Sequence, residues 1–305
     1  MVESGSGSFG SGGTAPPHAL IIQRYHHSMK GTAGIFSLVM VLAATPAWGR
    51  PAETEQLRVQ LISATDSVQP GRPLLVGLRF EMQKQWHIYW RNPGDSGEPP
   101  RIRWKLPAGF QAGEVQWPAP ERLGTGSVID YGYQGSVLLP VELQTPRSLA
   151  VGGSITLSAE VSWLVCKDIC VPGRADLTLS LPVRIAPGPV SASHSLFQET
   201  RSRLPKPMPP DWSAEATSEQ TFLVLTIHGV RGAEASFFPL EADQVDNAAP
   251  QTATKVPGGV RLTLKKSDQS SKTPARLDGV LKLSSGRAYA VSAPVHALPE
   301  QSTSP

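Results

Sequence analysis

The chain has little charge, few aromatic residues and only two cysteines. Of its 305 residues, 17% are charged and 7% are Phe, Trp or Tyr. No run of five or six like charges accompanies the net charge of +3, so the composition does not predict nucleic-acid binding. Two cysteines, Cys166 and Cys170, are too few for a disulfide-stapled miniprotein or a four-thiolate zinc site.

Proline and glycine, by contrast, are abundant. The chain holds 29 Pro and 28 Gly, together nearly a fifth of its residues, against roughly 12% in an average protein. This composition disfavours a helical bundle and is typical of many short strands joined by turns. The length is sufficient for two domains of ordinary size.

One long apolar segment occurs, near the start of the chain. Residues 1–28 are rich in Gly and Ser, and we expect them to be a mis-assigned or disordered extension. Residues 29–49 then begin with Met-Lys, continue with an apolar middle over 33–44 and end in small residues. This is the form of a secretory signal peptide, whereas a membrane span would need about 20 apolar residues. We therefore expect an exported, soluble product in a compartment where thiols can be oxidised.

Alternating apolar and polar residues recur from Leu57 onward, with turn residues between the runs. A period of two predicts β-strands. We expect strands at residues 57–61, 74–80, 86–90, 101–106, 113–117, 136–143, 154–165 and 175–185. So many short strands are typical of an antiparallel β-sandwich, which we predict for residues 50–186.

A proline-rich stretch separates this sandwich from a second one. In the predicted linker, 187–211, a short helix is expected at 193–204, and the prolines of 205–210 exclude helix and central strand there. Strands expected at 221–227, 260–264, 279–283 and 287–295 predict another β-sandwich over 212–298, before a disordered tail at 299–305. The predicted fold is all-β, with two antiparallel β-sandwich domains joined by a Pro-rich linker.

The two cysteines are separated by three residues. In an extended strand their Cα atoms would lie about 13 Å apart, but a disulfide needs roughly 4.4–6.8 Å, so a bond would require a turn over residues 167–169. Closing so short a loop contributes only about 2 kcal/mol in the chain-entropy model, yet it keeps a second thiol beside the first. Redox exchange, a structural bridge and ligation of soft Cu(I) all stay open. The Met and His residues show no ligand spacing, so no metal site is predicted.

The stretch WLVCKDICVP, from Trp163 to Pro172, resembles the cysteine motif in the periplasmic N-terminal domain of DsbD-type thiol:disulfide interchange proteins. It is most similar to the suppressor-of-copper-sensitivity branch, ScsB. Residues 86–97, 102–104 and 130–133 also look like that branch. The resemblance covers roughly residues 55–185, and the second sandwich matches more loosely, through a two-sandwich layout.

The resemblance implies an immunoglobulin-like domain that relays electrons in the periplasm without a cofactor. Cys170 would form a mixed disulfide and Cys166 would resolve it, as in a protein-disulfide reductase. The implied partners are a membrane-embedded electron carrier, expected here as a separate chain, and periplasmic thioredoxin-fold proteins. The alternative is a non-catalytic binding or assembly module, in copper handling, with a structural disulfide.

The resemblance also implies a capping loop and facing aromatic residues as cap or partner-docking positions. The loop would map to Asp130, Tyr131, Gly132 and Tyr133, and the aromatic stretch to Trp86, His87, Tyr89 and Trp90. In a strand, Trp86 and Trp90 would share one face while His87 and Tyr89 share the other.

Overall fold

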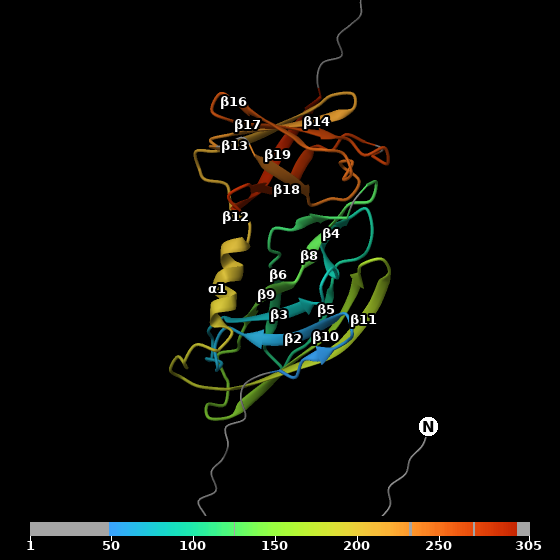
Figure 1. Ribbon diagram of the computed structural model, residues 1–305. Helices are drawn as coiled ribbons and strands as arrows, with labels where there is room; N and C mark the ends of the chain where they lie inside the picture. Colours follow the sequence, from blue (N-terminus) through green and yellow to red (C-terminus); the bar gives the residue numbers. More distant parts are fainter. Residues whose placement is uncertain (1–48, 125, 232–233, 271, 298–305) are drawn as a thin grey trace, which may run out of the picture. The chain divides into compact units, whose positions relative to one another are not determined.

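The computed structural model describes residues 49–297, except 125, 232–233 and 271 (Figure 1). The predicted extension, nearly all of the predicted signal peptide and the predicted tail lie outside the described residues. The described residues belong to one unit. None of the helices they form has the length and apolar character needed to cross a membrane.

Two sheets form the first sandwich. The five-stranded sheet has the order β1 (Ala52–Glu53), β2 (Leu57–Ser63), β3 (Leu74–Met82), β9 (Ser136–Gln144) and β6 (Gln111–Val115). The six-stranded sheet has the order β11 (Cys170–Pro182), β10 (Ser154–Cys166), β4 (His87–Gly94), β8 (Asp130–Gln134) and β7 (Glu121–Leu123), and β5 (Arg101–Lys105) pairs with β10. All of these pairs are antiparallel.

Apolar residues from both sheets fill the space between them. Leu61 and Leu78 from the five-stranded sheet are buried in one cluster with Ile88 and Val165 from the six-stranded sheet. Burying such side chains stabilises the fold by about 1.5–3 kcal/mol each. The period-two pattern of the sequence therefore places its apolar residues on the inner faces.

The second sandwich is built from one continuous eight-stranded set. Its order is β15 (Ala235–Pro239), β18 (Arg276–Leu283), β19 (Ala288–Ala297), β13 (Ser213–Ser218), β14 (Phe222–His228), β17 (Gly259–Lys265) and β16 (Thr252–Val256), with β12 (Lys206–Pro207) paired to β19. The long strand β19 pairs antiparallel with β18 and parallel with β13, so it joins the two layers. Leu225, Leu262 and Leu281 lie in the core between these layers.

Every strand expected from the sequence is present, and helix α1 (His194–Arg203) occupies the expected 193–204 segment. The all-β prediction with two sandwiches is confirmed. Short strands were missed, such as β13, whose sequence Ser-Ala-Glu-Ala-Thr-Ser has almost no apolar alternation. This strand pairs antiparallel with β14, the next strand along the chain, and parallel with β19, which is distant in sequence.

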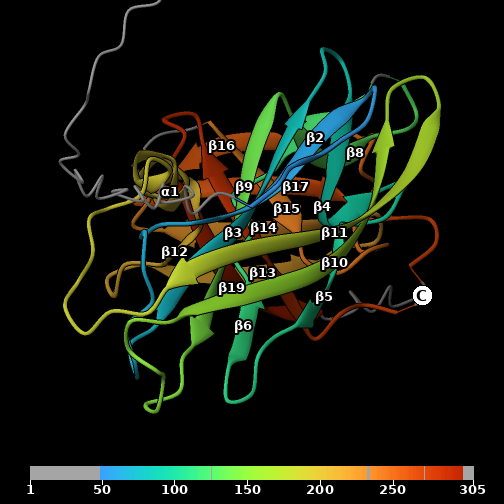
Figure 2. The ribbon, with the colours of Figure 1, turned by 90° about the horizontal axis from the view of Figure 1, so that it is seen from below.

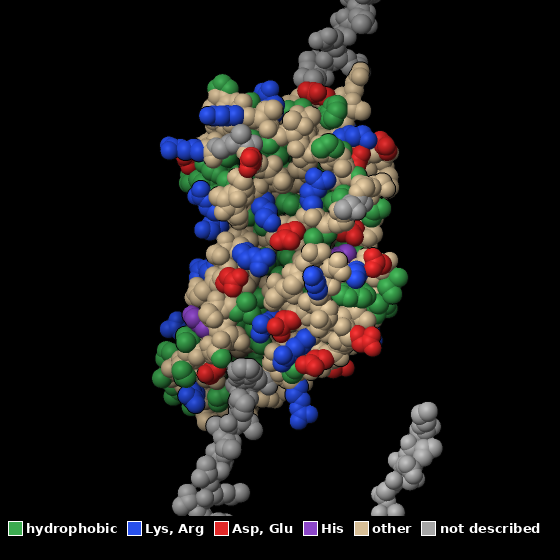
Figure 3. All heavy atoms as spheres, viewed as in Figure 1, with side chains coloured by type: hydrophobic (Ala, Val, Ile, Leu, Met, Phe, Trp, Pro, Cys, Tyr) green, Lys and Arg blue, Asp and Glu red, His purple; other side chains and the backbone are tan. Residues whose placement is uncertain are grey.

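Side chains of the second sandwich also pack into the core of the first. Phe238, from β15, is 2% exposed and belongs to the first core cluster. Its ring centroid lies 6.4 Å from that of Trp90 and 5.1 Å from that of Tyr131, both in edge-to-face geometry. The two sandwiches are therefore joined through packed aromatic rings. Basic and acidic side chains are interspersed over the face shown in Figure 3.

Candidate functional site

Cys166 and Cys170 form a disulfide where β10 turns into β11, two long strands that lie side by side in Figure 2. Cys166 ends β10, Cys170 begins β11, and the two are direct cross-strand partners with Cα atoms 4.1 Å apart. The turn between them is closed by a hydrogen bond of 3.1 Å from the Lys167 N–H to the Ile169 carbonyl oxygen. The expected turn over residues 167–169 is confirmed.

The two cysteines differ in exposure. Cys166 is 2% exposed, because β10 lies between β11 and β4 and pairs with His87 on the β4 side. Cys170 is exposed, because β11 is the outermost strand of the sheet. An incoming sulfur atom can therefore reach Cys170 before it reaches Cys166.

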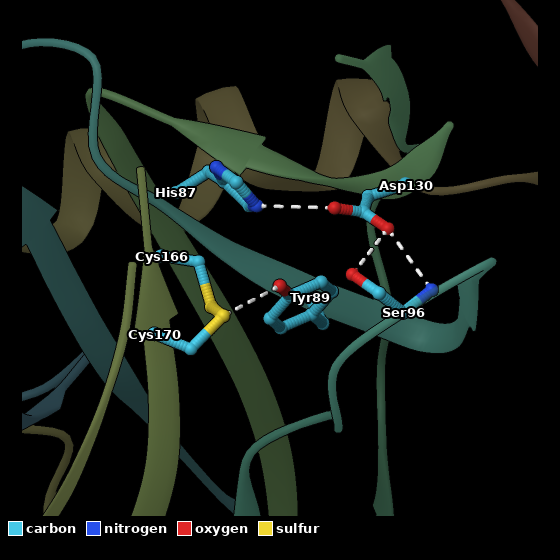
Figure 4. Close-up of a disulfide and its surroundings, with 6 residues drawn as sticks. All are labelled: His87, Tyr89, Ser96, Asp130, Cys166 and Cys170. Atoms are coloured by element: carbon cyan, nitrogen blue, oxygen red, sulfur yellow. Dashed lines mark hydrogen bonds and ion pairs between the residues drawn. A yellow bond between two sulfur atoms is a disulfide. The ribbon is translucent and has the colours of Figure 1, made fainter. Parts of the chain in front are cut away.

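His87 and Tyr89 extend from β4 on the face that carries the disulfide (Figure 4). The Tyr89 hydroxyl oxygen lies 3.7 Å from Cys170 Sγ, and the rings of Tyr89 and His87 meet edge to face at 5.2 Å. Burial raises the pKa of the Tyr89 phenol above its usual value; the nearby Ser96 side chain lowers it and the Asp130 carboxylate raises it. The phenol therefore stays protonated at neutral pH and can donate a hydrogen bond to sulfur.

Asp130 connects this face to the loop that follows β4. Its Oδ1 accepts hydrogen bonds from the Ser96 N–H at 3.1 Å and from the Ser96 hydroxyl at 2.9 Å. Its Oδ2 lies 3.5 Å from His87 Nε2, which makes no hydrogen bond of acceptable geometry within the described residues. Both Asp130 and His87 are buried.

Residues 95–97, here named the Ser96 loop, cover the Tyr89 ring. Gly97 has a φ of +76°, and a Cβ at this position would lie 2.0 Å from a ring carbon of Tyr89. Only glycine fits both the backbone conformation and this close approach. Sequence reasoning missed Ser96 and Gly97 as parts of the site, although they lie within residues 86–97, a stretch that resembles the family.

The other predicted site residues belong to the core or to strand β8. Trp86 packs against the core, and Trp90 is fully buried within it. Residues 130–133 lie in strand β8 and not in a loop, because they pair with β4 and β7. The buried Tyr131 and Tyr133 donate hydrogen bonds of 2.7 Å to Asn247 Oδ1 and the Pro118 carbonyl oxygen.

Gly132 lies in the same strand, where a Cβ would be 2.2 Å from the Ile88 carbonyl oxygen. Of the predicted cap and docking residues, the structure thus brings His87, Tyr89 and Asp130 together near the sulfurs. Capping or docking roles for these positions stay predictions. No three His, Cys, Asp or Glu side chains of the described residues are grouped so that they could hold a metal ion.

Comparisons with known proteins find a family model that matches the domain carrying this site. Residues 58–182 match the family model described as "Thiol:disulfide interchange protein DsbD, N-terminal". This span covers the first sandwich from β2 to the end of β11, including both cysteines. No curated protein matches the chain.

A solved structure extends the likeness to both sandwiches. The N-terminal periplasmic domain of ScsB from Proteus mirabilis aligns with a TM-score of 0.59 and 16% identity, over 82% of this chain and 97% of that chain. A protein of unknown function from Porphyromonas gingivalis W83 aligns with a TM-score of only 0.23, at 12% identity over 79% of this chain and 99% of that one. A TM-score this low does not indicate a shared fold. Residues 58–182, which hold both cysteines, therefore match the DsbD N-terminal family model, and the fold of the two sandwiches is similar to that of the ScsB N-terminal periplasmic domain.

Proposed function

We propose that this protein relays electrons in the periplasm by thiol–disulfide exchange through Cys166 and Cys170. A membrane-embedded carrier reduces the pair, and the pair then reduces thioredoxin-fold partner proteins. The observation that carries the proposal is the difference in exposure within one short hairpin: Cys170 is exposed at the sheet edge and Cys166 is 2% exposed beside it.

The exchange transfers two electrons in two steps. The Cys170 thiolate attacks one sulfur of a partner disulfide, a bond forms between Cys170 and that sulfur, and the other partner sulfur leaves as a thiolate that takes up a proton. Cys166, having lost its proton, then attacks Cys170 Sγ, and the partner departs with its second thiol. The Cys166–Cys170 disulfide is restored, and the membrane carrier reduces it by the same chemistry in reverse.

The surroundings of the pair fit these steps. Cys166 and Cys170 are directly opposite each other on neighbouring strands. The resolving Cys166 thiol therefore needs no large movement to reach Cys170. The Tyr89 hydroxyl, at 3.7 Å from Cys170 Sγ, can donate a hydrogen bond to the thiolate and favour it. The apolar core between the two sheets is made by residues other than the cysteines, so the sandwich can stay folded with the disulfide open.

The experiment is a mixed-disulfide trap with matched single-cysteine variants. Cys166→Ser leaves the exposed attacking sulfur without its resolving partner, so we expect thioredoxin-fold proteins from periplasmic extract to accumulate as covalent adducts, separated by non-reducing electrophoresis and identified by mass spectrometry. Cys170→Ser leaves only the buried sulfur, and we expect little or no adduct. Absence of such adducts from Cys166→Ser, or equal adducts from both variants, would count against the relay and favour an inert disulfide in a binding module.

A further inference from the structure

We infer that the second sandwich positions the redox site, with Asn92 and Asn247 as positioning residues. They hold the end of β4 and the Ser96 loop in place, the loop holds Tyr89, and Tyr89 sets the environment of Cys170. The inference deepens the proposed function and rests on it for its biological meaning.

The first connection is made by Asn92, near the end of β4. Its Nδ2 donates hydrogen bonds to the carbonyl oxygens of Pro239 at 2.8 Å and Glu241 at 3.3 Å, both in the second sandwich. Its Oδ1 accepts a hydrogen bond of 3.1 Å from the Gly94 N–H. One buried amide thus ties the backbone just before the Ser96 loop to β15 and the residues that follow it.

The second connection is made by Asn247. Its Nδ2 donates a hydrogen bond of 2.8 Å to Asp95 Oδ1, at the start of the Ser96 loop, and its Oδ1 accepts one of 2.7 Å from the Tyr131 hydroxyl. Asp95 Oδ2 in turn accepts a hydrogen bond of 2.7 Å from the Ile129 N–H. Asn247 is buried, and both its Nδ2 and its Oδ1 are hydrogen-bonded, which fixes the orientation of its side-chain amide.

The Ser96 loop connects these two asparagines to the Cys170 sulfur through Tyr89. Ser96 is bound to Asp130 through both its N–H and its hydroxyl, and Gly97 lies against the Tyr89 ring. The Tyr89 hydroxyl then lies 3.7 Å from Cys170 Sγ (Figure 4). A continuous series of contacts therefore leads from the second sandwich to the exposed cysteine.

Polar contacts of this kind are not required merely to join two sandwiches. Phe238 already packs against Trp90 and Tyr131, whereas a buried amide or carboxylate is unfavourable unless it is hydrogen-bonded. Asn92 lies at the end of β4 and Asn247 bonds to Asp95 just beyond it, so both connections meet the second sandwich at one place, between residues 147 to 152 positions apart in the sequence. Because both connections hold the Ser96 loop, we infer that they position this loop and do not merely join the two sandwiches.

The test measures the Cys170 thiol directly, in the full chain carrying Cys166→Ser, as the rate of alkylation by iodoacetamide against pH. If Tyr89 favours the thiolate, Tyr89→Phe should move the midpoint of the rate profile to higher pH and lower the thiolate fraction near neutrality roughly threefold, the effect of one weak hydrogen bond. Asn247→Ala should do the same. The double variant should show no more than the larger single effect, because both changes act through the same contact.

The matched control is Lys282→Ala. Lys282 Nζ donates a hydrogen bond of 3.0 Å to the Pro120 carbonyl oxygen across the same junction, away from the Ser96 loop, so its loss should leave the rate profile unchanged. Other charged or titratable groups near Cys170, namely Lys167, Asp168, His87 and Asp130, are present in every variant. Thermal unfolding checks that each variant is folded; if Asn247→Ala is not, Asn92→Ala tests the same loop through the other connection.

An unchanged profile in a folded Asn247→Ala or Asn92→Ala variant would overturn the inference, as would equal shifts from Lys282→Ala or simple additivity with Tyr89→Phe. Because iodoacetamide replaces the protein partner, this result is independent of the mixed-disulfide trap. Failure to trap a partner would contradict the proposed function, but the effect of Asn92 and Asn247 on the alkylation of Cys170 could still be measured.

Discussion

In the reduced protein, Cys170 is expected to react with iodoacetamide at least about tenfold faster than Cys166 at neutral pH, because reactivity follows thiolate access. Cys170 is exposed on the outermost strand, whereas Cys166 is 2% exposed between β11 and β4. The measurement is brief alkylation followed by mass spectrometry of the two cysteine peptides. The same reagent in concentrated urea provides the control, where both thiols should react at similar rates.

Equal rates in the folded protein would contradict this asymmetry. Such a result would mean that β10 and β11 separate in the reduced state, so that the burial of Cys166 depends on the disulfide itself. The assignment of Cys170 as the attacking sulfur and Cys166 as the resolving sulfur would then lose its structural basis.

Replacing Phe238 with alanine is expected to lower the free energy of unfolding by about 3–5 kcal/mol, the usual effect of removing a large buried aromatic side chain. Phe238 is 2% exposed and packs against Trp90 and Tyr131, so its loss would leave a cavity at the junction of the two sandwiches. Urea unfolding followed by tryptophan fluorescence measures the change.

Phe222→Ala is the matched control, because Phe222 lies on β14 with 37% exposure. This variant should lose less than about 1 kcal/mol, since less apolar surface is removed from the interior. Similar small losses from both variants would show that the aromatic junction is not packed in solution, and the positioning role of the second sandwich would lose its support.

Much of the strand layout could be predicted from the sequence, because period-two alternation is a local property of the chain. The β4 alternation correctly places Trp90 in the core and Tyr89 on the opposite, disulfide-bearing face. The turn needed to join Cys166 and Cys170 also follows from local geometry, since residues four apart in a strand cannot form a disulfide.

The site around the disulfide was harder to predict, because its contacts connect distant segments. Tyr131 was expected in a capping loop, yet it lies in a strand, where it packs against Phe238 and donates a hydrogen bond to Asn247. Nothing near Asn247 in the sequence marks it as a partner of Asp95, since the contact exists only once the second sandwich has packed onto the first. The sequence also gives no sign that Gly97 packs against the Tyr89 ring, because that contact depends on how the Ser96 loop folds over β4.

The most direct test of the account is the reduction potential of the Cys166–Cys170 pair, measured by equilibrating the full chain in glutathione redox buffers and quantifying both thiols by mass. An exchange disulfide is predicted to have a potential above about −300 mV, with the protein folded in both states. A potential below that value is typical of structural disulfides and would contradict a relay through this pair.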